Sequence, residues 1–438
     1  MESSKLIAIN AAERNRTNPT QAKPNNNQAM ITIGLLFFVF GFVTWLNGTL
    51  IPFLKLACQL ETDVQAFFVT FAFYMAYFLL AIPSSYILKK TGFKNGMALG
   101  LLVMAVGSIL FVPAANARSF GLFLTGLFVQ GTGLALLQTA SNPYVSIIGP
   151  IESAAKRISI MGICNKVAGA LSPLIVGAIV LKGANELEES INTATDAVQK
   201  EQLLQQLASR VITPYLVITV VLVILAFLIK KSSLPEIDTD KEDTAATGAT
   251  PKKSVFEFRH LWLGVLCLFL YVGVEVMAGD AIGIYGRSIG MPLDKTKYFT
   301  TFTLIAMLVG YIIGIFTIPK VISQQKGLRI SAVLGIIISI GIYFSSGYMA
   351  ITLIALLGLA NALMWPAIFP LAIAGLGKFT KIGSALLIMG IAGGALIPLL
   401  YGHLKELPSI GNSLAFLLCM LPCYVYILYY AVAGYKRK

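Results

Sequence analysis

The sequence predicts an all-α membrane protein whose chain crosses the lipid bilayer about twelve times. Hydrophobic residues make up 57% of its 438 residues and charged residues only 12%, whereas a soluble domain carries about 25% charged residues. Long apolar runs recur along the chain, and each has close to the ~20 residues that a helix needs to cross ~30 Å of hydrocarbon. A chain with so little polar surface is suited to lipid as its solvent.

The apolar runs form two groups of six, separated by a polar segment. The expected spans are residues 30–54, 66–88, 96–114, 119–147, 156–181 and 211–229, then 260–286, 297–319, 328–346, 348–375, 380–401 and 411–434. The predicted division is a disordered tail at 1–29, a six-helix bundle at 30–230, a linker at 231–257 and a second six-helix bundle at 258–438. We expect the acidic stretch 183–210 to form a short amphipathic helix outside the membrane.

The positions of Lys and Arg predict the orientation of the chain. With both termini in the cytoplasm, most of the 33 basic residues fall on cytoplasmic segments, as the positive-inside rule requires. The same distribution accounts for the net charge of +13 without a nucleic-acid partner, because a nucleic-acid binder gathers its basic residues on one soluble face. We therefore expect cytoplasmic termini and no nucleic-acid binding.

Two short basic turns lie at matching places in the two groups of spans. Residues 89–94 follow the second span, and residues 319–329 follow the eighth. Equivalent turns six spans apart predict two parallel repeats with a binding site between them. The alternative is that short cytoplasmic loops are commonly basic and glycine-bearing without any repeat.

The polar side chains inside the spans are mostly neutral amides, accompanied by aromatic rings. Polar groups are costly in a membrane, so they usually face a cavity or a partner helix. Amides both donate to and accept from hydroxyls, and an aromatic face stacks on the C–H face of a sugar ring. An anionic substrate would need paired arginines, and no span has an arginine near its middle. We therefore predict a cavity for a neutral polyol such as a hexose, with the candidate residues Asn47, Tyr74, Gln138, Asn142, Asn165, Asn361 and Trp365. For each amide the alternative is an interhelical hydrogen bond.

Three ionisable residues within the spans are candidates for coupling. Glu275 lies near the middle of the seventh span, and Lys166 in the fifth span is the only candidate cationic partner. A Lys166–Glu275 ion pair would link the two halves, whereas the alternative for Glu275 is a hydrogen-bonded carboxyl that closes helix contacts. Asp280 lies about 140° around the helix from Glu275 and is expected nearer the outer end.

Enzyme and channel functions find little support in the sequence. The two histidines, His260 and His403, lie near span ends and far apart in the chain. We see no phosphate-binding loop, no cluster of His, Cys and carboxylate for a metal, and no re-entrant filter segment. We therefore expect neither catalysis, nor a cofactor, nor a metal.

Several strings resemble motifs of the fucose–galactose–glucose:proton symporters, the FHS family within the major facilitator superfamily. Residues 41–55 (GFVTWLNGTLIPFLK), 71–78 (FAFYMAYF) and 137–145 (LQTASNPYV) are similar to its first, second and fourth helices. Further similarity lies at residues 152–157, 164–166, 271–276 and 389–395. The resemblance implies two six-helix bundles, alternating access, and import of monosaccharides into bacteria across the inner membrane, driven by protons or, in some relatives, by sodium.

The sequence departs from the fucose branch at its two acidic positions. In that branch an Asp in the first-helix motif and a Glu before the Thr-Ala-x-Asn-Pro-Tyr string handle the proton and the sugar. This chain has Gly48 and Gln138 there, and neither side chain titrates near neutral pH. The resemblance therefore implies a sugar site and directs the search for a coupling residue to Glu275 or Asp280.

We thus predict a monomeric, proton-coupled importer of a neutral monosaccharide such as glucose, galactose, fucose or an amino sugar. The alternatives are a sodium-coupled symporter, an uncoupled facilitator and a non-transporting membrane sensor of sugar. The tail and the linker are too short to hold a soluble signalling domain, which weighs against the sensor.

Overall fold

The computed structural model describes residues 26–147, 154–232, 234, 254–318, 321–376 and 379–437. These residues form helices and connecting turns, without a β-strand among them. Most of the predicted tail and most of the predicted linker lie outside the described residues.

The first half of the described chain runs to Lys231. Its helices are α2 (Asn26–Thr44), α3 (Asn47–Ala57), α4 (Asp63–Ile109), α5 (Phe111–Asn116), α6 (Phe120–Ile147), α7 (Ala154–Val180), α8 (Ala184–Thr193), α9 (Ala197–Ser209) and α10 (Ile212–Lys231). The second half begins with the short helix η3 (Val255–Glu257). It continues with α11 (Arg259–Gly279), α12 (Ile282–Ser288), α13 (Leu293–Thr296), α14 (Phe299–Thr317), α15 (Gln324–Tyr343), α16 (Gly347–Asn361), α17 (Met364–Ile373), α18 (Thr380–Met389), η5 (Gly390–Ala392), α19 (Gly393–Glu406), α20 (Gly411–Val432) and η6 (Gly434–Lys436).

Eleven helical segments of the described chain are long and apolar enough to span a membrane. One of them, residues 63–116, has 54 residues and would reach about 80 Å as a straight helix, far beyond the ~30 Å hydrocarbon core. It folds back at Gly92, where φ is 75° and ψ is 170°, a conformation that glycine adopts without steric penalty. The segment therefore makes two passes, and the prediction of about twelve crossings is confirmed.

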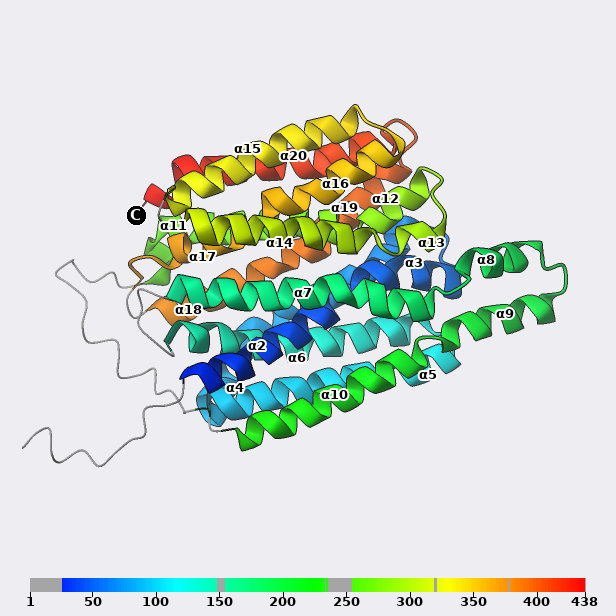
Figure 1. The fold of residues 1–438 in the computed structure, drawn as a ribbon, viewed down its shortest axis with the longest axis horizontal. Helices are drawn as coiled ribbons and strands as arrows, with labels where there is room; N and C mark the ends of the chain where they lie inside the picture. Colours follow the sequence, from blue (N-terminus) through cyan, green and yellow to red (C-terminus); the bar gives the residue numbers. More distant parts are fainter. Residues whose placement is uncertain are drawn as a thin grey trace, which may run out of the picture.

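The helices run side by side between two ends of the molecule (Figure 1). The start of α2, the end of α10, the start of α11 and the end of α20 lie at one end, which we call the termini end. Helices α3, α8, α12 and α13 lie at the opposite end, the far end. Along α10 the exposed apolar side chains Val217, Val220, Ile224 and Phe227 recur at helical spacing, which gives the outer surface an apolar stripe suited to lipid.

The acidic stretch 183–210 forms two helices rather than the single amphipathic helix that the sequence suggested. Helices α8 and α9 fold as a hairpin that projects at the far end (Figure 1). The chain is extended at Ala194 (φ −63°, ψ 117°), and the Asp196 carboxylate caps α9 by accepting from the Val198 N–H at 3.1 Å. An aspartate N-cap of this kind starts a new helix and so divides the stretch.

Several predicted spans are broken near their middles, which the apolar pattern did not show. The first span breaks between α2 and α3, at Trp45 and Leu46, and the seventh breaks between α11 and α12. At the second break, the hydroxyls of Thr300 and Thr303 donate to the carbonyls of Gly279 and Ala278, each at 2.7 Å. A helix can be interrupted at membrane depth when neighbouring groups satisfy the freed backbone, and α14 supplies these groups here.

Candidate functional site

A cavity of about 130 Å³ lies between the two halves, which is room for several water molecules. The first half contributes residues of α2, α4, α6 and α7, and the second half contributes residues of α11, α14, α17 and η5. The predicted residues that line the cavity together are Tyr74, Gln138, Asn142, Asn165, Trp365, Lys166 and Glu275. The structure therefore brings together most of the residues predicted from the sequence, from five separate helices.

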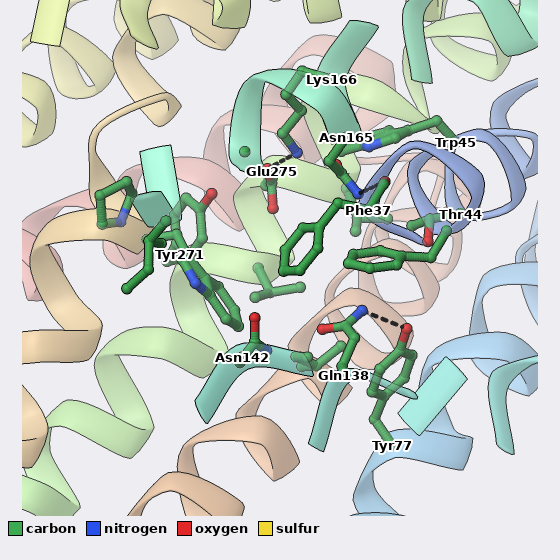
Figure 2. A pocket seen from close by; sticks show the side chains of 18 of the residues that line it. Phe37, Thr44, Trp45, Tyr77, Gln138, Asn142, Asn165, Lys166, Tyr271 and Glu275 are labelled. Atoms are coloured by element: carbon green, nitrogen blue, oxygen red, sulfur yellow. Dashed lines mark hydrogen bonds and ion pairs between the residues drawn. The ribbon is translucent and has the colours of Figure 1, made fainter. Parts of the chain in front are cut away.

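The amides of the first half line the cavity from two helices, with Asn165 beside Lys166 on α7 and with Gln138 and Asn142 together on α6 (Figure 2). Gln138 donates from Nε2 to the Tyr77 hydroxyl at 3.0 Å, and its carbonyl oxygen has no hydrogen-bond partner among the described residues. Asn165 donates weakly from Nδ2 to the Phe37 carbonyl at 3.5 Å. Gln138 thus offers an acceptor to a hydroxyl-bearing ligand while Tyr77 holds its orientation.

An ion pair crosses the cavity from one half to the other. Lys166 Nζ of α7 lies 2.8 Å from Glu275 Oε1 of α11, and their side chains are only 8% and 10% exposed. The same ammonium lies 4.2 Å from the centroid of the Trp45 ring, a distance at which a cation interacts with an aromatic face. The structure therefore contains the bridge between halves that the sequence suggested as a hypothesis.

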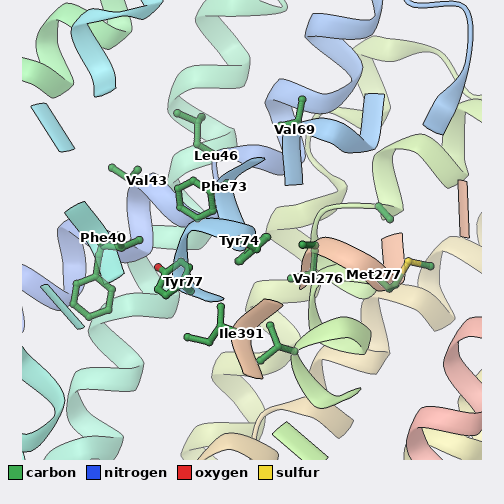
Figure 3. Packing of buried hydrophobic residues seen from close by; sticks show 14 of the residues in the cluster. Phe40, Val43, Leu46, Val69, Phe73, Tyr74, Tyr77, Val276, Met277 and Ile391 are labelled. Atoms are coloured by element: carbon green, nitrogen blue, oxygen red, sulfur yellow. The ribbon is translucent and has the colours of Figure 1, made fainter. Parts of the chain in front are cut away.

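Aromatic rings form much of the remaining wall. Trp365 stacks on Phe369 with centroids 5.9 Å apart and contacts Tyr271 at 6.4 Å. On the opposite side, Tyr74 and Tyr77 are stacked at 6.4 Å. The two tyrosines belong to a buried apolar cluster that includes Val276 and Ile391 from the second half (Figure 3). Such faces suit the apolar side of a sugar ring.

Two predicted substrate residues, Asn47 and Asn361, do not line the cavity. Asn361 is fully buried, accepts from the Tyr424 hydroxyl at 2.8 Å and donates to the Val274 carbonyl at 3.5 Å. Its amide thus joins α16 to neighbouring helices, as the interhelical alternative supposed. Asn47 begins α3 and is 1% exposed, and neither of its side-chain polar atoms has a hydrogen-bond partner in the described structure.

Asp280 also lies outside the cavity lining, but it is linked to the cavity. It caps the C-terminus of α11, is completely buried, and accepts a hydrogen bond from the Tyr74 hydroxyl at 3.4 Å. Tyr74 itself lines the cavity, so the Tyr74 hydroxyl links Asp280 to the cavity.

The structure adds lining residues that the sequence did not single out as binding residues, among them Tyr271 and Tyr311. Tyr271 stands four residues before Glu275, and residues with this separation share a helix face. This spacing was a usable signal. Tyr311 had no comparable signal, because it lies in an ordinary apolar run of α14.

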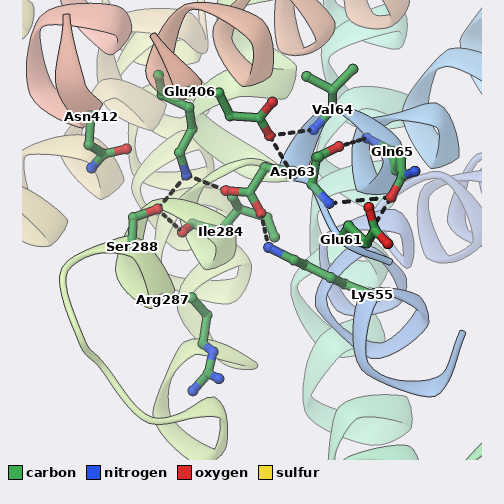
Figure 4. Close-up of polar contacts among 12 residues, drawn as sticks. Lys55, Glu61, Asp63, Val64, Gln65, Ile284, Arg287, Ser288, Glu406 and Asn412 are labelled. Atoms are coloured by element: carbon green, nitrogen blue, oxygen red, sulfur yellow. Dashed lines mark hydrogen bonds and ion pairs between the residues drawn. The ribbon is translucent and has the colours of Figure 1, made fainter. Parts of the chain in front are cut away.

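The far end is closed by polar contacts between the halves (Figure 4). The Asp63 carboxylate of α4 pairs with Lys55 of its own half and with Lys405 of α19 in the other half. Glu406 accepts from the Asp63 and Val64 N–H groups at 2.8 and 3.4 Å, where the start of α4 favours negative charge. Arg287 of α12 also pairs with Glu188 of α8.

The cavity extends instead toward the termini end. Asn142 and Ile158, near the termini-end limits of α6 and α7, line it and are partly exposed. Asn47 and Asp280, on its far side, are 1% and 0% exposed. The described residues contain no group of three or more His, Cys, Asp or Glu that would hold a metal ion.

Comparison with known proteins decides the family. Residues 33–402 match the family model of the Major Facilitator Superfamily. The chain belongs to this superfamily. Its fold and family are those of membrane transporters and not of enzymes.

The relatives narrow the position within the superfamily. The chain is 33% identical to the glucose/galactose transporter of Brucella abortus, over 95% of this chain and 96% of the relative. It is 28% identical to the L-fucose-proton symporter of Escherichia coli, over 85% of each chain. These relatives confirm the predicted membership of the fucose–galactose–glucose:proton symporter family.

A solved structure agrees with this placement. The crystal structure of the transporter FucP in the outward conformation matches with a TM-score of 0.72 at 27% identity, covering 92% of this chain and 97% of that chain. The structure of the D-xylose-proton symporter matches with a TM-score of 0.65 at 16% identity, which is a likeness of fold.

Proposed function

We propose that this transporter imports a neutral monosaccharide across the bacterial inner membrane by alternating access, driven by protons, and that it acts as a monomer. The observation that carries the proposal is the cavity between the halves, where amides and aromatic rings converge. Relatives named as glucose/galactose transporter and L-fucose-proton symporter support the same substrate class.

The charges in the cavity favour a neutral substrate. Lys166 and Glu275 neutralise each other at 2.8 Å, so neither is free to hold an anionic or cationic ligand without breaking a buried pair. Breaking such a pair costs about 3–5 kcal/mol. Hydroxyls can instead hydrogen-bond to Gln138 and Asn165 while a ring face stacks on Trp365.

The orientation follows from the positive-inside rule, which assigns the termini end to the cytoplasm. In this orientation the far-end network shuts the cavity from outside, and the partly exposed residues Asn142 and Ile158 lie toward the cytoplasm. The related FucP structure is described as outward. The two structures would then represent opposite halves of one transport cycle.

An uncoupled facilitator is the second candidate, favoured by Gly48 and Gln138 at positions where the fucose branch carries acids. Transport assays on the purified protein in liposomes distinguish the candidates. Labelled glucose, galactose, fucose, mannose and N-acetylglucosamine would be supplied with an inward proton gradient, an inward sodium gradient, or none.

We expect uphill accumulation with the proton gradient alone, abolished by a protonophore. Accumulation with the sodium gradient alone would show that the coupling ion is sodium and not the proton. Equilibration of the sugar without accumulation would establish an uncoupled facilitator. Sugar binding without any flux would overturn the transport proposal in favour of a sensor. Sugar-induced proton movement, measured in the wild type and in Glu275→Gln, tests whether that carboxylate takes part.

A further inference from the structure

Asp280 is a fully buried carboxyl group without a cationic partner. Its Oδ2 atom accepts from the Tyr74 hydroxyl at 3.4 Å, and its Oδ1 atom is buried without a hydrogen-bond partner in the described structure. None of the ion pairs between described residues includes Asp280, and Lys166 is engaged with Glu275. Burial of an ionised carboxylate in this condition is strongly unfavourable, so the observed packing suits the neutral carboxylic acid.

The carboxyl group lies at the seam between the halves. Asp280 belongs to the second half, whereas Tyr74, which donates a hydrogen bond to it, belongs to the first. The adjoining Gly279 is packed so closely on Trp45 that a Cβ there would lie 2.3 Å from the indole ring. Separation of the halves at the far end would therefore remove these contacts and admit water to the carboxyl group.

The charged and titratable groups around Asp280 come from three helices. Tyr74 approaches from α4, Glu275 lies on the same helix, and Lys166 acts from α7 at longer range. Because Lys166 and Glu275 largely cancel as a pair, they leave no net positive charge for an ionised Asp280. Proton binding is then the simplest way to neutralise it.

Building on the proposed function, we propose that Asp280 is the proton-binding site that controls closure of the far end. A proton taken up from outside neutralises the carboxyl group and allows the halves to close over it. In the closed state, the Tyr74 hydroxyl turns from Asp280 toward the cavity and donates to water there, so that the protonated carboxyl group donates to the Tyr74 oxygen. The carboxyl proton then passes to the Tyr74 oxygen while the Tyr74 hydroxyl releases its own proton to that water. The carboxylate that remains disfavours the closed far end, which returns the transporter to the outward side.

The conformational part of this proposal is testable without any sugar. Ile284 is 2% exposed and lines a crevice at the far end together with Lys55 and Asp63. We would place Ile284→Cys in the full chain, with Cys58→Ser, and follow its reaction with a bulky hydrophilic maleimide in lipid nanodiscs. After correction for thiolate content, we expect labelling to rise about tenfold from about pH 5 to about pH 9, because ionised Asp280 opens the far end.

The Asp280 variants separate Asp280 from the far-end ion pairs, because loss of the Lys405 proton at high pH would loosen its pair with Asp63 and raise labelling in the same direction as ionisation of Asp280. Protonation of Asp63 at low pH would loosen its pairs with Lys55 and Lys405 and would increase labelling there, which is the opposite trend. In Asp280→Asn, labelling should stay low at every pH, and in Asp280→Glu the pH dependence should persist. The matched control Asp294→Asn changes a carboxyl group at the far end of the same half and should behave as the wild type. Labelling that is independent of pH in the wild type, or that keeps its pH dependence in Asp280→Asn, overturns the proposal.

Transport by the same variant distinguishes this inference from the proposed function. We expect Asp280→Asn to lose proton-driven accumulation, so that the ratio of internal to external sugar falls to unity. Exchange of labelled for unlabelled sugar should remain within about twofold of the wild type, because the neutral amide imitates the protonated acid. Retained uphill accumulation in Asp280→Asn would refute the role of Asp280 and leave the importer intact. Absence of all sugar flux in the wild type would refute the importer, and the labelling data would still decide the role of Asp280.

Discussion

Gln138 illustrates how one amide can be positioned for a ligand. Its nitrogen is held by the Tyr77 hydroxyl, and its oxygen remains available in the cavity. We predict that Gln138→Ala raises the KM for the transported sugar about 10–100-fold, the equivalent of about 1–3 kcal/mol for a lost buried hydrogen bond. Initial uptake rates across a range of sugar concentrations would measure the change.

The same helix offers a matched control for this prediction. Gln130 of α6 is also a buried amide, but it donates to Ser108 at 2.7 Å and does not line the cavity. Gln130→Ala should lower the melting temperature and leave KM unchanged. An equal rise of KM in both variants would mean that Gln138 acts through helix packing and not through the sugar.

The Lys166–Glu275 pair leads to a second prediction at the residue scale. Lys166→Ala or Glu275→Ala leaves one buried charge without its partner and should reduce uptake strongly, with a stability cost of about 3–5 kcal/mol. Exchange of the two residues, Lys166→Glu with Glu275→Lys, should recover part of both losses. Uptake and thermal melting of all three variants measure this, and an exchange variant no better than the single variants would contradict a bridging role.

For single residues, the sequence predicted which side-chain types would form the site better than it predicted which of those side chains face the cavity. Gln138 and Asn361 are both amides inside spans, and residue type alone predicted both as binding residues. The structure separates them, because Asn361 is occupied by Tyr424 and Val274 whereas Gln138 faces the cavity. The difference depends on which way each helix is rotated against its neighbours, and an apolar pattern that surrounds a helix on all sides does not specify this rotation.

Helices α4 and α6 meet through glycines that permit close approach. A Cβ at Gly133 would lie 2.4 Å from the Gly100 carbonyl oxygen, and a Cβ at Gly100 would lie 2.8 Å from the Gly133 oxygen. We predict that Gly133→Ala forces the helices apart and destabilises the protein by about 1–3 kcal/mol. Thermal melting in detergent would detect this as a lower midpoint.

Gly121 provides the comparison on the same helix. A Cβ there meets nothing within 4 Å, so Gly121→Ala should leave the melting temperature unchanged or raise it slightly. A similar fall in the melting temperature of both variants would show that replacing glycine by alanine in this helix is destabilising by itself, and that the contact between α4 and α6 is not the cause.

At the scale of elements, the number and order of the spans could be predicted because each span needs a fixed length of apolar chain. The breaks could not be predicted in the same way. The break after α11 depends on Thr300 and Thr303 of another helix, which lie more than a dozen residues away. Long-range hydrogen bonds of this kind leave no periodic trace in the local sequence.

The far-end network affects the balance between the two conformations of the whole molecule. Asp63 pairs with Lys405 across the halves, and no equivalent inter-half ion pair joins the described residues at the termini end. We predict that Asp63→Asn weakens closure of the far end and increases maleimide labelling of Ile284→Cys about threefold or more. A loss of about 1.4 kcal/mol in the free energy of closure would change the conformational equilibrium tenfold, so a smaller loss is enough for this increase.

The control for this prediction removes a charge without breaking an inter-half contact. Glu201 at the far end pairs with Arg118 of the same half, so Glu201→Gln should leave labelling unchanged. Added salt should reproduce part of the Asp63→Asn effect, because exposed ion pairs are screened. Unaltered labelling in Asp63→Asn would show that apolar packing alone closes the far end.

For the whole molecule, the sequence predicted two halves, a cavity between them and a bridging ion pair. It did not predict which end is closed. Conformation depends on small free-energy differences between two packings of the same helices, and these differences are summed over contacts such as those of Asp63, Lys405 and Glu406. The amino-acid sequence therefore predicts the fold more directly than it predicts which of the two conformations the molecule adopts.

The placement of the tryptophans gives the molecule an intrinsic optical reporter. The chain has three tryptophans, of which Trp45 and Trp365 line the cavity, one from each half, while Trp262 stacks on Phe256 near the start of α11. Because the Trp45 ring faces the Lys166 ammonium at 4.2 Å, its emission should respond when the bridge to Glu275 opens. Fluorescence of the unlabelled protein, with Trp262→Phe as background, would then follow ligand entry and helix movement in real time.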